Sequence, residues 1–160
     1  MSEAPLTKEL RQFLKPYDLG VVAIATAARS VLFEEAPAAM ELIYDAYNAV
    51  AMGYSFTGRP SDAFCHVAVY SQWVNLGFNR GSELPDPEGL LVGSGRLVRH
   101  LRMQSLSNLE RPFVRSFVRA AIAAAKGSPG RSPAEASSPT SIVRAVYPKK
   151  QRPKPSARSR

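Results

Sequence analysis

Apolar residues recur along the first part of the chain with the spacing of two helices. Leu6 to Phe13 is a short amphipathic segment, and Pro16 follows where a helix would have to end. A longer segment begins after Asp18, a favourable N-cap residue, and continues to about Glu35. Because this second segment is apolar on most of its faces, we expect it to be a heavily buried helix.

From Met40 onward, short runs rich in β-branched and aromatic residues replace the helical spacing. A stretch with turn composition, residues 57–62, separates two of the runs, and the dipeptide Ser71-Gln72 between two others is typical of a hairpin. The runs that we expect to form strands are residues 42–44, 50–56, 64–70, 73–78 and 97–103.

A last helix is expected near Arg111, because Pro112 is tolerated only in the first turn of a helix. Residues 107–110 match a capping box just before it. Its apolar stripe at helical spacing consists of Val114, Phe117, Val118, Ala121, Ile122 and Ala125. The order of elements predicts an α+β fold, with an antiparallel sheet of about five strands packed by N- and C-terminal helices.

The composition changes after Lys126, and we therefore divide the chain into a folded domain, residues 1–126, and a tail, residues 127–160. The tail is basic and rich in Ser and Pro, which predicts disorder because it has too little apolar surface to bury. Ile142 to Tyr147 is a small apolar island in this tail. The island either docks on the domain or binds a partner.

The net charge of +8 resides mostly in the tail. Residues 1–126 carry 13 basic and 12 acidic side chains, whereas residues 127–160 carry 8 basic and 1 acidic. The tail therefore predicts weak, salt-dependent contact with nucleic acid through residues 149–160, or else a passenger extension. Inside the domain, residues 1–95 are acidic overall and residues 96–126 are basic, which indicates either ion pairing between the two parts or an anion-binding face.

Cys65 is the only cysteine, so no intramolecular disulfide can form. The N-terminal residues lack the apolar core of a signal peptide. The longest apolar stretch, residues 19–28, is much shorter than the roughly 20 residues that cross a bilayer. We expect a cytoplasmic protein that does not enter a membrane.

The most informative segment is residues 77–100, a polar loop rich in Gly and Pro that leads into a cluster of cations. Such a shaped loop is typical of a ligand-facing surface. In the stretch Gly93-Ser94-Gly95-Arg96, backbone N–H groups could cradle an anion, although a simple tight turn is the alternative. We expect Asp86 to bond to nearby backbone N–H groups. The candidate ligand-binding residues are Arg80, Arg96, Arg99 and His100.

Catalytic and metal chemistry find little support in the residue pattern. His66 and His100 are the only histidines, and adjacent strand residues such as Cys65 and His66 point to opposite faces of a sheet. We therefore expect no metal site, no cofactor and no catalytic residues. These observations favour a binding module for a small anionic ligand or a protein partner.

The segment Leu76 to His100 contains a Gly-Phe pair, then Leu-Pro-Asp-Pro, then Leu-Leu-Val-Gly-Ser-Gly-Arg-Leu-Val-Arg-His. This pattern resembles the bacterial YdhG-like family, catalogued mainly as a domain of unknown function, and the resemblance covers about residues 18–126. It implies a compact α+β fold of frataxin-like appearance. At least one member of the wider group is described as an iron chaperone, so the resemblance implies iron delivery as an alternative function.

Overall fold

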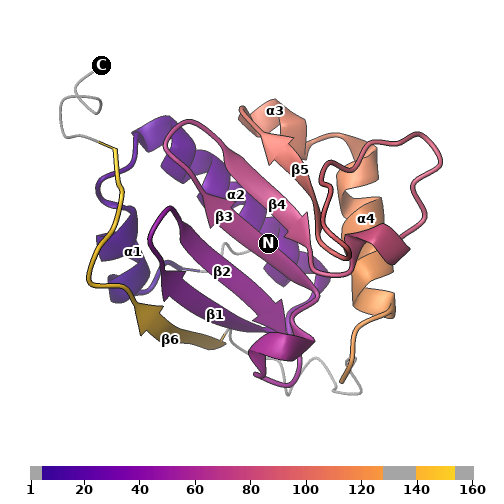
Figure 1. Ribbon diagram of the computed structural model, residues 1–160, viewed down its shortest axis with the longest axis horizontal. Helices are drawn as coiled ribbons and strands as arrows, with labels where there is room; N and C mark the ends of the chain where they lie inside the picture. Colours follow the sequence, from indigo (N-terminus) through magenta and orange to yellow (C-terminus); the bar gives the residue numbers. More distant parts are fainter. Residues whose placement is uncertain (1–4, 128–139, 154–160) are drawn as a thin grey trace.

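The computed structural model describes residues 5–127 and 140–153, and it has two layers, a sheet and the helices that cover one of its faces (Figure 1). The helices are α1 (Lys8–Leu14), α2 (Leu19–Glu35), α3 (Leu106–Leu109) and α4 (Pro112–Ala123). The strands are β1 (Met40–Asp45), β2 (Val50–Ser55), β3 (Cys65–Val69), β4 (Val74–Phe78), β5 (Arg99–Met103) and β6 (Thr140–Val146). The predicted α+β class is confirmed.

The sheet has the strand order β5-β4-β3-β2-β1-β6. Strands β1 to β5 form an antiparallel meander in chain order, and β6 pairs with the free edge of β1 in the parallel direction. The expectation of about five antiparallel strands is therefore wrong for the sheet as a whole, because the described residues form six strands in a mixed sheet.

Strand β6 lies in the segment that we expected to be a disordered tail, and that expectation does not hold for Thr140–Val146. The apolar island Ile142 to Tyr147 docks on β1. Most side chains of β6 remain exposed, so the strand gains order from backbone pairing with an open sheet edge and not from a core of its own. The rest of the expected tail, residues 128–139 and 154–160, lies outside the described residues.

The core lies between the sheet and α2. A row of mutually paired residues points to this side of the sheet and is fully buried: Ile43, Met52, Val67 and Leu76. The facing side of α2 contributes Ile24, Ala28 and Leu32. This packing confirms that the second helix is heavily buried. Asp18 holds its N-cap position, as expected, but makes no side-chain cap hydrogen bond.

A buried ion pair crosses this core. The guanidinium of Arg29 on α2 donates from Nε and Nη2 to the carboxylate of Glu41 on β1, at 2.7 and 3.1 Å. The hydroxyl of Tyr54 on β2 donates to the same carboxylate at 2.7 Å, and Ser141 of β6 donates to it as well. Burial, followed by the nearby Glu41 charge, holds the pKa of Tyr54 well above its usual value. Four elements therefore meet at one carboxylate.

The expected pairing between the acidic and basic parts of the domain is present where α4 meets the end of α2. Arg115 lies 2.8 Å from Glu34 and 2.7 Å from Glu35, and Arg119 lies 2.7 Å from Glu35. The hydrogen bonds from Arg119 and then Arg115 lower the pKa of Glu35. Helix α4 begins after Arg111, as predicted, whereas the capping box lies earlier than expected, at residues 105–108, and opens α3.

Candidate functional site

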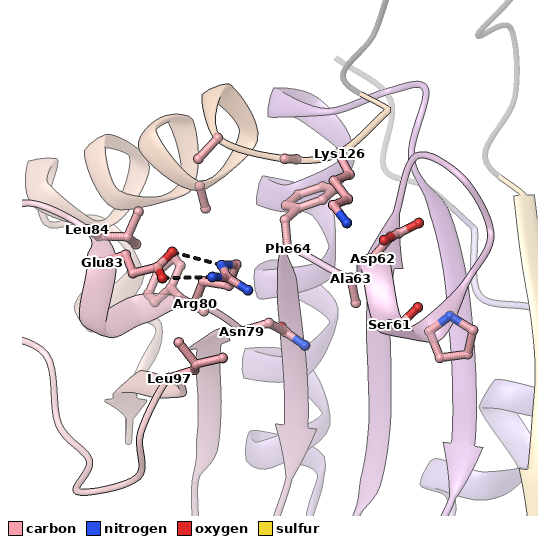
Figure 2. A pocket seen from close by; sticks show the side chains of 15 residues that line it. Ser61, Asp62, Ala63, Phe64, Asn79, Arg80, Glu83, Leu84, Leu97 and Lys126 are labelled. Carbon is pink, nitrogen blue, oxygen red and sulfur yellow. Dashed lines mark hydrogen bonds and ion pairs between the residues drawn. The ribbon is translucent and has the colours of Figure 1, made fainter.

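A cavity of about 660 Å³ lies where β3 begins and β4 ends (Figure 2). Its walls come from a 3₁₀ turn over Pro60–Asp62, the first part of the 79–100 loop and the C-terminal end of α4. Leu97 closes it from the other end of the same loop. Segments far apart in the sequence therefore meet around one space.

Apolar side chains form much of the lining of this cavity. They include the two aromatic rings of Phe64 and Phe78 and the aliphatic side chains of Leu84 and Leu97. Helix α4 and the two residues that follow it contribute only small side chains here, at Ala121, Ala124 and Ala125. The size of the cavity and its apolar lining are typical of small-molecule sites, which measure roughly 300–1,000 Å³.

Charged side chains stand at the edge of the cavity. The Nε and Nη2 atoms of Arg80 donate to the two carboxylate oxygens of Glu83, at 2.8 and 2.7 Å, in an exposed bidentate pair. Asp62 accepts a hydrogen bond from the hydroxyl of Thr57 at 2.9 Å. Lys126 also lines the cavity, and within residues 5–127 and 140–153 it makes no ion pair. A positive charge that has no ion-pair partner among the described residues therefore borders a cavity lined by both apolar and polar groups.

Asn79 connects the cavity with the face of the sheet that the helices leave open. Its side-chain oxygen lies 2.9 Å from Nδ1 of His66. Because an amide oxygen only accepts, Nδ1 of His66 carries the hydrogen and Nε2 keeps its lone pair. The ring extends over Gly77, where an added Cβ would lie 1.9 Å from Nε2. Burial lowers the pKa of His66, so the imidazole is neutral at pH 7.

The structure does not bring the four predicted ligand-binding residues into one cluster. Arg80 lines the cavity, and the charge of Arg96 acts on Glu83 beside it. Arg99 instead donates from Nη1 to the carbonyl oxygens of Gly95 and Val98, at 2.5 and 2.7 Å, and so holds the backbone of its own loop.

His100 lies on the open face of the sheet, where it is paired with Gly77 in register. Partial burial, then the positive charge of Arg102 and then His66, lower the pKa of His100. It therefore faces His66 and Arg102 and does not line the cavity.

Asp86 does what the loop composition predicts. Its carboxylate oxygens accept hydrogen bonds from the backbone N–H groups of Leu90 and Leu91, at 2.8 and 3.0 Å. The backbone N–H of Gly89 also donates to the Asp86 carbonyl, and Gly89 has a φ of 66°. This part of the loop is thus a turn built around one side chain.

Sequence reasoning missed three polar residues that line the cavity: Asp62, Asn79 and Lys126. Each stands next to a turn or at a boundary between elements, where composition alone does not tell a cavity wall from a connector. One usable signal was present in the last turn of α4, where small Ala side chains follow the larger residues of the apolar stripe. A helix end that carries only Ala against a core leaves space beside it.

Within the described residues, no group of three or more His, Cys, Asp and Glu side chains is arranged to hold a metal ion. Cys65 faces the core, where burial strongly raises the pKa of its thiol. None of the described helices is both long and apolar enough to cross a membrane. No protein-family model, curated protein or solved structure matches this chain, so the YdhG-like and frataxin-like resemblance stays a prediction.

Proposed function

We propose that this protein is a binding module for a small molecule that has an apolar body and an anionic group, and that the cavity beside the 79–100 loop is its site. The observation that carries the proposal is the position of Lys126, a cation without an ion-pair partner in the described residues, at a cavity that also has an apolar wall. A carboxylate or phosphate would supply the missing counter-charge.

The proposed binding mode divides the ligand between two parts of the cavity. A flat apolar body would lie against the half-buried side chains of Leu84 and Leu97, where it removes apolar surface from water. The anionic group would accept hydrogen bonds from Lys126, and Arg80 would contribute if it turned away from Glu83. That Arg80–Glu83 pair is exposed, so exchanging one partner costs little. We therefore propose Lys126 and Arg80 as the principal contacts of the anionic group, in place of Arg96 and Arg99.

A matched pair of probes tests the proposal: 2-naphthoate and its neutral amide, 2-naphthamide. We expect naphthoate to bind about 10-fold more tightly, because a hydrogen bond to a charged group contributes roughly 1.5–3 kcal/mol. The Lys126→Ala variant should bind the two probes equally. Binding is measured by NMR titration of the ¹⁵N-labelled full chain, in which the shifted amides should be those that line the cavity.

Two further variants separate the site from general effects. Lys8→Ala removes the same charge from an exposed position on α1 and should leave the preference for naphthoate unchanged. Ala124→Trp fills the cavity from an exposed position and should abolish binding of both probes. Equal affinity of naphthoate for the parent chain and for both Lys126→Ala and Ala124→Trp would overturn the proposal.

A further inference from the structure

Residues 140–153, here named the C-terminal segment, lie along the edge of β1 as a bound peptide would. Strand β6 pairs with β1 in parallel, with one irregularity between Ile43 and Tyr44. Backbone contact continues beyond the strand, because the N–H of Tyr147 donates to Asp45 at 2.9 Å and the N–H of Gln151 donates to Tyr47 at 2.7 Å. The segment thus binds the edge of the sheet mainly through backbone hydrogen bonds, as in β-augmentation.

The first side-chain anchor of the C-terminal segment is Ser141. Its hydroxyl donates to Oε1 of Glu41, the buried carboxylate that the domain already supplies with donors from Arg29 and Tyr54. Ser141 therefore completes a polar centre whose other members belong to the domain. The position selects a small side chain with a hydroxyl, because a carboxylate can only accept.

The second anchor is a pair of cations that reach Asp45 at the end of β1. Asp45 is buried, with 3% of its surface exposed. Lys150 donates to Oδ2 at 2.5 Å, and Arg152 donates to Oδ1. Both side-chain ion pairs that Asp45 makes in the described residues thus come from the C-terminal segment. Arg152 also donates to the carbonyl oxygens of Ala46 and Tyr47.

The route of the chain allows this docking within one molecule. Gly127 lies beside Thr57, and the neighbouring Gly58 lies beside Met40, which is the register partner of Thr140. Twelve residues, 128–139, separate the two described parts, and a chain of that length spans at most roughly 40 Å. A tethered segment with nearby ends has an effective concentration on the order of millimolar, so it outcompetes most free peptides.

We propose that the edge of β1 is a peptide-binding site and that the C-terminal segment is its resident ligand. The site recognises an extended chain that carries a hydroxyl residue and, further along, two basic residues separated by one position, as in Ser141, Lys150 and Arg152. A peptide of this pattern from another chain binds the same edge once the resident segment is displaced. Glu41 and Asp45 are the two residues that select the sequence.

The test uses the full chain with its resident segment weakened and a labelled peptide offered in trans. The triple variant Ser141→Asp/Lys150→Glu/Arg152→Glu places acids against both carboxylates of β1, which expels the segment by like-charge repulsion. A fluorescein-labelled peptide of residues 140–153 should bind this variant at least 10-fold more tightly than it binds the parent chain. Fluorescence anisotropy measures the affinity, and circular dichroism verifies that the variant remains folded.

Two altered peptides give a matched comparison, because each has lost two positive charges. In the first, Lys150 and Arg152 are replaced by Ala, and its affinity for the triple variant should fall at least 10-fold. In the second, Arg144 and Lys149 are replaced by Ala. Those side chains are exposed and make no ion pair in the described residues, so its affinity should stay within about 3-fold of the unaltered peptide. Equal affinities of the two altered peptides, or no binding of the unaltered one, would overturn the proposal.

If the triple variant does not fold, hydrogen exchange on the full chain decides the question. The amides of Tyr147 and Gln151 should exchange at least 10-fold faster in Lys150→Ala/Arg152→Ala than in Arg144→Ala/Lys149→Ala. Equal exchange in the two variants would mean that Asp45 does not hold the segment, and the proposal would then be wrong.

Discussion

Replacing Glu41 by Gln should be among the most damaging conservative changes in this protein. From the described part of the chain, Arg29 Nη2 and Ser141 donate to one carboxylate oxygen of Glu41, and Arg29 Nε and Tyr54 donate to the other. A glutamine amide keeps one oxygen, so its NH₂ group must face one of these pairs of donors. In either orientation one N–H of the buried Arg29 guanidinium faces the NH₂ group in place of a carboxylate oxygen, and the charge–charge attraction between positions 29 and 41 is lost.

Breaking a buried ion pair on one side costs about 3–5 kcal/mol, against a total stability of roughly 5–15 kcal/mol for a domain. At about 2–4 °C per kcal/mol, the melting temperature of Glu41→Gln should fall by roughly 6–20 °C. Urea unfolding gives the free energy, and Trp73, the only tryptophan, supplies a fluorescence signal. The double variant Arg29→Met/Glu41→Leu is the control, because it removes both charges and should lose less than Glu41→Gln alone. A loss below about 1 kcal/mol in Glu41→Gln would refute the argument.

Three smaller predictions concern protonation, glycine positions and the loop. Burial lowers the pKa of His66 in the folded chain, so as the pH falls below about 6.5 the unfolded chain takes up a proton at this residue before the folded chain does. The free energy of unfolding should therefore decrease below that pH. In urea-unfolding measurements over pH 5–7, His66→Gln should reduce this dependence on pH. Gly81→Ala places a Cβ 2.5 Å from that of Arg99 and should cost about 1–3 kcal/mol, whereas Gly20→Ala meets nothing within 4 Å and should stabilise α2 by up to about 1 kcal/mol in thermal melts. Asp86→Ala leaves two backbone N–H groups without their acceptor, and faster amide exchange at Leu90 and Leu91 would reveal it.

The elements that sequence reasoning predicted are those whose evidence is local. Helix α2 is apolar on most of its faces, strands β1 to β5 carry short apolar runs, and each of these elements packs against the common core. Strand β6 shows only the short apolar island at Ile142 to Tyr147, which left docking on the domain and binding to a partner as alternatives. Its order comes from the open edge of β1, a hundred residues earlier in the chain, and from anchors such as Ser141 that hydrogen-bond only across that distance.

Only one wall of the candidate cavity could be predicted from the sequence, for a related reason. The 79–100 loop drew attention through its Gly and Pro residues, and Arg80 does line the cavity. The opposite wall comes from Lys126 and from the turn at Pro60–Asp62, whose proximity depends on how α4 crosses the end of the sheet. Arg99 donates to two carbonyl groups of its own loop, and its place in a Gly-rich segment does not tell such a contact from one to a ligand.

Because His66 contacts Gly77, the residues at these two positions should co-vary among homologous chains. The imidazole occupies the space where any side chain at position 77 would begin, so a substitution at 77 requires the His66 ring to move. Homologous chains that carry a residue other than Gly at 77 should therefore carry a small residue at 66. Mutagenesis libraries that vary only position 77 should recover few folded variants, whereas libraries that vary both positions should recover paired solutions.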